Sequence, residues 1–267
     1  MFSLLKIEWL KLKSYRAFWV MMTMYVVMFP VAMVFVANFA LSIKKSNMVT
    51  ETIFRNYFAF PDVWQSVAFF GGFFLLLPVI LLIILVTNEF TFRTHRQNII
   101  DGWSRTEFIS AKLIILVLFA LIATVMVAGT SVLVGYLQTP EPLPDNIFYG
   151  FHYVPYFFLQ SLLYLLVGFL IALLFKRSGL AIGFFLLLIG VIDNILGFLM
   201  NKYLSESGYF FPTNAADNLV RNPFLDVAKS TGLFDMPYSD ETIIAACVGY
   251  VVLFTGFLFW RFRRTDL

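Results

Sequence analysis

The chain has 267 residues, of which 60% are hydrophobic and only 13% are charged, and its formal net charge is +3. Soluble domains are nearer to about 45–50% apolar, so a mean hydropathy of +0.84 excludes an ordinary soluble domain and indicates a polytopic membrane protein. The apolar runs continue for about 20 residues, whereas an outer-membrane barrel has shorter segments of alternating polarity. We therefore expect an all-α fold built from transmembrane helices.

The first predicted element is an interfacial helix at residues 1–17. Leu5, Trp9 and Leu12 recur at helical spacing among basic residues. This pattern is typical of a helix that lies in the membrane interface with its charged side chains among the lipid headgroups. The apolar run that follows is too long for a cleaved signal peptide, so we expect an uncleaved N-terminal anchor.

Six runs are long enough to cross a bilayer. They are residues 18–41, 66–87, 113–137, 153–175, 180–201 and 242–260. Pro30 and Pro78 lie inside the first two runs and are expected to kink them. No repeat or domain boundary is visible, which predicts one transmembrane domain over residues 1–267. Residues 202–241, between the last two spans, are predicted to lie outside and to form one or two short helices on the outer surface.

The basic residues predict how the spans are oriented. If the N-terminus is cytoplasmic, the inside segments hold thirteen of the 19 Lys and Arg residues, although the outside segments are longer in total. These inside segments are residues 1–17, 88–112, 176–179 and 261–267. The positive-inside rule therefore predicts that both termini face the cytoplasm.

Residues 88–112 form the longest charged interruption between two apolar runs, and we call them the elbow. Gly102 indicates a turn, because glycine adopts positive φ at no steric cost. Ser104 and Glu107 have the spacing of a capping box, which starts a new helix. We expect the second span to continue as a helix to about Ile100, a break at Gly102, and a new helix leading into the third span. A solvated hairpin whose basic residues only set the topology is the alternative.

Eight residues of the elbow follow one another in a recognisable order: a Glu at the end of the span, a Thr, a hydrophobic pair, a turn, a Ser-Arg pair and a Lys. They are Glu89, Thr94, Ile99, Ile100, Gly102, Ser104, Arg105 and Lys112. This order resembles the hallmark between spans two and three in the permease subunits of ABC exporters of the second type. Two departures concern the local path of the elbow: Arg93 stands where a Gly usually precedes the Thr, and Gly102-Trp103 replaces a turn that usually contains Pro.

The resemblance implies a six-span permease in the inner membrane of a bacterium, with the elbow as a coupling helix seated in a cleft of an ATP-binding subunit. It also implies two such ATPase subunits, which hold ATP and magnesium, and a second permease that is either the same chain or another one. The sequence has no phosphate-binding loop, and no Gly-Lys pair occurs in it, so nucleotide chemistry is expected on the partner. Apart from the lipid bilayer we expect no other partner, and in particular no nucleic acid.

Small residues and one acidic residue stand out within the spans. Glycines at intervals of seven residues in the fifth and sixth spans predict close helix packing, either within one subunit or at a subunit interface. They are Gly183, Gly190, Gly197, Gly249 and Gly256. Asp193 and Asn194 lie near the centre of the fifth span, where a carboxylate is costly, so Asp193 is expected to face the bundle interior. It then either pairs with a neighbouring span or belongs to the transport path or its gate.

The sequence does not indicate an enzyme. His95 and His152 are predicted on opposite sides of the membrane and cannot share a metal, and no His-Glu-x-x-His or Gly-x-Ser-x-Gly motif occurs. We therefore expect a transporter subunit with no metal and no cofactor of its own. Two alternatives stay open. One is a membrane-embedded lipid-modifying enzyme, for which only Asp193, Asn194 and Asn38 are candidate polar residues, and the other is a non-transporting membrane scaffold.

Overall fold

The computed structural model describes residues 2–46, 57–92, 94, 104–204, 207–225 and 238–264. Over these residues the chain is helical and has no strand, which confirms the predicted all-α fold. Six stretches of helix in the described chain are long and apolar enough to cross a membrane. They are Arg16–Ser42, Val63–Thr91, Thr106–Gln138, Tyr153–Phe175, Ser178–Tyr203 and Asp240–Phe262. Each corresponds to one predicted span, and the chain is a multi-pass membrane protein.

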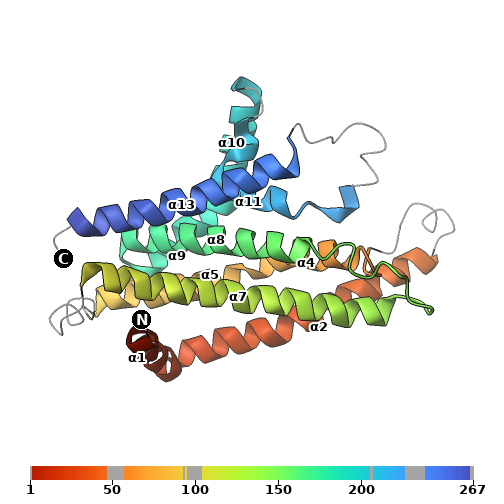
Figure 1. Cartoon of the computed structure of the whole chain (residues 1–267), viewed down its shortest axis with the longest axis horizontal. Coiled ribbons are helices and arrows are strands. Elements are labelled where there is room, and N and C mark those ends of the chain that lie inside the picture. The colour runs from red at the N-terminus through yellow and green to blue at the C-terminus, as the bar shows by residue number, and fades with distance from the viewer. Residues whose placement is uncertain are drawn as a thin grey trace.

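The first half of the chain supplies a short N-terminal helix and three spans. Its helices are α1 (Phe2–Ser14), α2 (Arg16–Ser46), α4 (Val63–Phe74), α5 (Leu76–Thr91) and α7 (Arg105–Gln138). The regular helix is interrupted at Tyr15, which separates α1 from α2. Figure 1 shows α1 at one end of the bundle, lying across the direction of the long helices. The predicted separate N-terminal helix is therefore present.

The second half is built around α8, which is the central helix of the molecule. Its elements are α8 (Tyr153–Phe175), α9 (Ser178–Leu187), the π-helical turn η1 (Leu188–Ile192), α10 (Asp193–Tyr203), η2 (Ser207–Phe210), α11 (Pro212–Leu219), η3 (Pro223–Leu225) and α13 (Asp240–Arg264). Helix α8 packs against α4, α5, α7, α9, α11 and α13. The apolar stretch of α8 is 72% buried within the chain, whereas the apolar stretches of the last two spans are only 17% buried. Those two outer spans leave most of their apolar surface uncovered by this chain.

The prolines inside the first and second spans behave differently. The second span breaks at Leu75 into α4 and α5. Pro78 explains the break, because it has no N–H for the Phe74 carbonyl and its ring crowds that carbonyl. The predicted kink at Pro78 is confirmed. Pro30 lies inside α2, which is one helix from Arg16 to Ser46 and does not break there.

The fifth span is irregular at its centre and changes direction there. Between α9 and α10 the helix widens to the π-helical turn η1, a local feature that often marks functional sites. Figure 1 shows α9 following α8, whereas α10 turns away from the bundle. The chain then returns, and α11 packs against α8 and α13 with Thr213, Ala215, Ala216 and Leu219 buried. The prediction that the short helices between the last two spans lie on the outer surface does not hold for α11. Its small alanines allow close approach to the spans.

Candidate functional site

The two ends of the elbow meet in a largely buried group of four charged residues, which we call the ion cluster. The Lys112 Nζ lies 2.8 Å from Glu8 Oε2 and 2.5 Å from Glu89 Oε1. The Lys11 Nζ lies 3.1 Å from Glu8 Oε1 and 3.3 Å from Glu89 Oε1. The Lys112 and Glu8 side chains are only 5% and 4% exposed. Two carboxylates and two ammonium groups therefore neutralise one another in a protein interior.

Three helices bring the ion cluster together. Glu8 and Lys11 are three residues apart and share one face of α1. Glu89 lies in the last turn of α5, and Lys112 lies near the start of α7. A neighbouring hydrogen bond from Asn88 Nδ2 to Tyr15 Oη, at 2.9 Å, links the same end of α5 to the junction of α1 and α2. The ion cluster thus ties the N-terminal helix to the two helices that flank the elbow.

Within the ion cluster, the side chains of Glu8 and Lys11 favour their charged forms. Burial raises the pKa of Glu8, but attraction and hydrogen bonds from Lys112 and Lys11 outweigh burial and hold the pKa below its ordinary value. Burial lowers the pKa of Lys11, but Glu89 and Glu8 outweigh it and raise the pKa above its ordinary value. Both residues precede the first span. Glu8 and Lys11 are therefore charged at neutral pH.

The capping box predicted in the elbow is confirmed. The Ser104 side chain accepts from the Glu107 amide, and the Glu107 carboxylate accepts from the Ser104 amide at 2.8 Å. Helix α5 ends at Thr91 and a turn follows at Phe92, so the second span does not continue as an unbroken helix. Thr94 is helical again, and the rest of the predicted continuation to Ile100 lies outside the described residues. The Thr94 hydroxyl donates to the Glu89 carbonyl at 3.4 Å. The other predicted docking residues lie outside the described residues: Ile99, Ile100, Gly102 and the side chain of Arg105.

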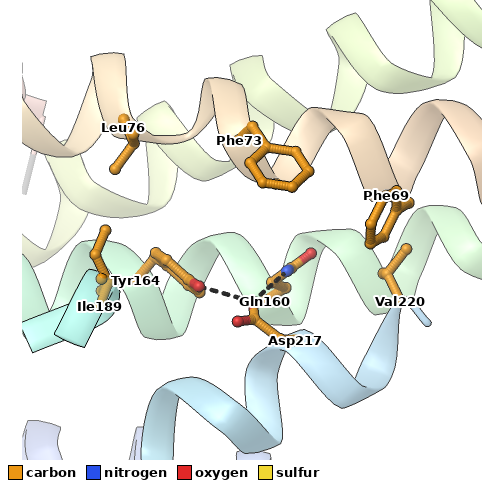
Figure 2. Close-up of a pocket in the computed structure, with 10 residues that line it drawn as sticks. Phe69, Phe73, Leu76, Gln160, Tyr164, Ile189, Asp217 and Val220 are labelled. Atoms are coloured by element: carbon orange, nitrogen blue, oxygen red, sulfur yellow. Dashed lines mark hydrogen bonds between the residues drawn. The ribbon is translucent and has the colours of Figure 1, made fainter. Parts of the chain in front are cut away.

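A cavity of about 330 Å³ lies beside the middle of α8, and we call it the mid-span cavity. It opens where regular helices are interrupted, at the break between α4 and α5 and at η1, and α11 closes another side. Most of its lining is apolar: Phe69, Gly72, Phe73, Leu76, Ile189, Gly190 and Val220. The polar lining residues are Gln160, Tyr164 and Asp217. Figure 2 shows these side chains between α8, the α4–α5 segment and α11.

A carboxylate of α11 organises the polar part of this cavity. Asp217 Oδ1 accepts from Tyr164 Oη at 2.7 Å and from Gln160 Nε2 at 3.0 Å. Burial raises the pKa of Asp217, and these two hydrogen bonds only partly oppose that rise. Asp217 nevertheless keeps accessible surface and lines the cavity. A carboxylate that faces an apolar cavity can bind a positively charged group.

The structure separates the neighbours Asp193 and Asn194. Asp193 is 2% exposed, which confirms that it faces the interior, but its two carboxylate oxygens have no hydrogen-bond partner among the described residues. The predicted partner on a neighbouring span is therefore not found, and only its backbone carbonyl accepts, from Asn214 Nδ2 at 3.3 Å. Asn194 lies on the exposed side of α10, and its amide donates to the Gly190 carbonyl of the preceding π-helical turn η1.

The five predicted packing glycines do not behave alike. A methyl group at Gly197 would lie 2.5 Å from Asn214 Nδ2, so this glycine permits close contact within the chain. At the other four, a methyl group would have no atom of another described segment within 4 Å: Gly183, Gly190, Gly249 and Gly256. Of these five glycines, only Gly197 packs closely against another segment of the same chain, and Gly190 lines the mid-span cavity.

Several site residues were missed by sequence reasoning. Glu8 is the one acidic residue among the basic residues of the N-terminal helix, and that contrast was a usable signal for an ion pair. Gln160 and Tyr164 lie in an apolar run without a distinguishing pattern. Asp217 belongs to the segment that was predicted outside. Among the described residues, no group of three or more His, Cys, Asp or Glu side chains could hold a metal ion.

Comparison with known proteins places the chain in one family. No curated protein matches it. One family model covers nearly the whole sequence, from residue 17 to residue 267, and therefore includes all six spans, the elbow and the mid-span cavity. The chain thus belongs to the family described as "Protein of unknown function (DUF2705)".

Proposed function

We propose that the chain is the permease subunit of an ATP-driven exporter, and that a separate ATP-binding subunit docks at the elbow. In this proposal both termini and the elbow face the cytoplasm of a bacterium, and the spans lie in its inner membrane. ATP and magnesium are held by the partner, and this chain moves the cargo by alternating access. The observation that carries the proposal is the ion cluster, which joins both ends of the elbow to α1.

The ion cluster supports a mechanical role for the elbow. Separating a buried ion pair leaves uncompensated charges in a poorly polarisable interior, which costs about 3–5 kcal/mol. Glu89, Lys112 and Glu8 therefore remain together when the elbow is displaced. A push from a docked partner is then passed to α5, α7 and α1 as a unit, instead of being absorbed in the connecting segment. Movement of these helices against α8 changes the access to the bundle interior.

A second permease subunit is part of the proposal. The last two spans are largely uncovered by this chain, and their apolar faces carry Gly183, Gly249 and Gly256 with open space around them. Small residues let helices from two subunits approach closely in lipid. Replacing Gly256 by Leu is therefore expected to weaken self-association without changing the fold of one chain, as measured by single-molecule photobleaching in liposomes. The same dimer population in the variant would argue against this face.

Copurification tests the proposal. The tagged chain is isolated from its native membrane in mild detergent, bound proteins are identified by mass spectrometry, and ATP hydrolysis is assayed. We expect a P-loop ATPase in the complex. A complex without an ATPase would favour the membrane scaffold or the lipid-modifying enzyme over the permease.

Elbow variants show whether docking occurs where we propose. Arg105→Glu, or Ile99→Asp combined with Ile100→Asp, is expected to abolish ATPase binding while the spans stay folded. Lys202→Glu on α10 is the matched control, because it reverses an exposed charge on the fifth span, away from the elbow. Wild-type ATPase binding and coupling in both elbow variants would reject docking at this segment.

A further inference from the structure

The mid-span cavity contains more hydrogen-bond acceptors than donors. Its two side-chain donors, Tyr164 Oη and Gln160 Nε2, both point to Asp217 Oδ1. The second carboxylate oxygen, Oδ2, receives no hydrogen bond from the described residues and lies on a side chain that lines the cavity. What the cavity lacks is a hydrogen-bond donor.

Gln160 provides an independent sign of a missing ligand. The residue is only 4% exposed, and its Oε1 has no hydrogen-bond partner among the described residues. Figure 2 shows the amide of Gln160 projecting from α8 toward the α4 segment that carries Phe69 and Phe73. A buried amide oxygen without a partner costs roughly 1–3 kcal/mol, so it is normally paired in a functional state.

The charge of the cavity points to a positively charged ligand. No Lys, Arg or His occurs among the described lining residues. Asp193, buried at the start of α10, has no hydrogen-bond partner for either carboxylate oxygen among the described residues and lies within electrostatic range of Asp217. A carboxylate in apolar surroundings without a counter-charge is unfavourable. A bound cation offsets that cost.

The apolar walls select an organic cation over a bare ion. Phe69, Phe73 and Leu76 form one side, with Ile189 and Val220 nearby. A volume of about 330 Å³ suits a small molecule, and aromatic faces attract cationic groups. A hydrated inorganic ion would leave these walls in contact with water instead of an apolar body.

We propose that the mid-span cavity binds a small organic amine in its protonated form, with an apolar body against Phe69 and Phe73. The ammonium group donates N–H bonds to Asp217 Oδ2 and Gln160 Oε1. Tyr164 is a positioning residue, because its hydroxyl holds the Asp217 carboxylate through the other oxygen. Binding rests on the cavity itself and does not depend on the proposed export function.

Three probes of similar length test the proposal on the purified full chain in lipid nanodiscs. Calorimetry compares 2-phenylethylammonium, the neutral 2-phenylethanol and the anionic 3-phenylpropionate. We expect saturable binding of the ammonium, at least tenfold tighter than either of the others. No saturable binding of the ammonium, or equal binding of the alcohol, overturns the proposal, and so does full displacement of the ammonium by sodium at the concentration of the probe. This ranking is made on the unaltered chain, so it decides even if a variant does not fold.

Variants locate the ammonium group. Asp217→Asn keeps the shape and one acceptor oxygen but removes the charge, and we expect at least tenfold weaker binding. Gln160→Met removes the unpartnered oxygen and should weaken binding severalfold. Asp145→Asn is the matched control, an exposed acid outside the cavity, and should bind as the unaltered chain does. Undiminished affinity in Asp217→Asn, with folding verified by thermal unfolding, contradicts the assignment.

Discussion

The chain holds charged side chains between its helices in two places, and their neighbours are of opposite kinds. In the ion cluster, the carboxylates of Glu8 and Glu89 both contact the ammonium groups of Lys11 and Lys112. In the mid-span cavity, the Asp217 carboxylate is held by two neutral donors and has no basic neighbour among the described lining residues. The charges of the ion cluster are balanced within the chain, whereas in our proposal a bound cation balances the charge of Asp217.

The two regions also differ in how regular the surrounding helices are. The ion cluster joins the ends of α1, α5 and α7, where long side chains reach across helix termini. The mid-span cavity lies at the break before Pro78, at the π-helical turn η1 and at α11, where regular packing is interrupted. Paired charges suit a rigid joint, because separating them is costly. An unpaired carboxylate beside irregular helices suits a site whose occupancy changes.

The largest effect should come from removing the central charge of the ion cluster. Lys112→Met leaves Glu8 and Glu89 buried with only the partly exposed Lys11 as counter-charge. The free energy of unfolding should fall by about 3–5 kcal/mol, because an uncompensated buried charge remains. Denaturant titration of the chain in detergent micelles measures the loss.

A basic residue of the same N-terminal helix provides the control for Lys112. Lys13 has an exposed side chain on α1, so Lys13→Met should change stability by less than about 0.5 kcal/mol. Equal losses in the two variants would mean that the ion cluster has no special stabilising role.

A smaller effect is expected at Glu8. Glu8→Gln keeps one acceptor oxygen for the two lysines but removes the negative charge, while Glu89 continues to neutralise Lys112. We expect a loss of about 1–3 kcal/mol by the same titration, which is the range for a charged hydrogen bond. A loss as large as that of Lys112→Met would place the main ion pair at Glu8 and not at the elbow.

In the interior of the fifth span, removing a charge should raise the free energy of unfolding instead of lowering it. Asp193→Asn removes a buried carboxylate whose oxygens have no partner among the described residues, so stability should rise by roughly 1 kcal/mol. A marked loss of stability would indicate that Asp193 is a structural residue with a partner. Unchanged export together with unchanged folding would reject a role for Asp193 in the transport path.

The smallest effect is a difference in pH dependence between the two regions. The pKa of Glu8 is lowered, so its stabilising contribution is present above its ordinary pKa of 4.5 and is lost as the pH falls through the lower pKa of the folded state. The pKa of Lys11 is raised, so its contribution is lost only as the pH rises above its ordinary 10.5. The stability difference between the unaltered chain and Glu8→Gln should therefore be constant from about pH 6 to pH 9.

Asp217 should show the opposite trend. Its pKa is raised above the ordinary 3.8, so its folded form is favoured at low pH and loses stability as the pH rises through the raised pKa. Relative to Asp217→Asn, the unaltered chain should become less stable as the pH rises from 3.8 through the raised pKa of the folded state, as thermal unfolding in micelles can measure. A flat difference over that range would mean that burial does not perturb this carboxylate.

Much of the fold was predictable, because hydrophobic runs of span length specify helices whatever they pack against. The six spans, the separate N-terminal helix, the capping box at Ser104 and Glu107 and the break caused by Pro78 all depend on local sequence. The end of α5 at Thr91 and the return of α11 into the bundle depend on tertiary packing. Local patterns contain no signal for these two features.

The candidate sites were predictable only in part. Glu89 and Lys112 were selected because of a resemblance, and the structure joins them directly. It also joins Lys112 to Glu8, a contact across 104 residues that no local spacing reveals. Asp193 stood out because a carboxylate in an apolar run is rare. Asp217 did not stand out, because acidic residues are common in polar segments. Only folding places it beside Gln160 and Tyr164.

Site-specific crosslinking from the elbow tests the central claim most directly. A photoreactive amino acid replaces Trp103 in the elbow or, as a control, Tyr149, which is 77% exposed beyond the opposite end of α7. After irradiation of intact cells, crosslinked partners are identified by mass spectrometry. The account predicts that a P-loop ATPase is captured from position 103 and not from position 149. Absence of any ATPase at position 103, or equal capture from both positions, would contradict it.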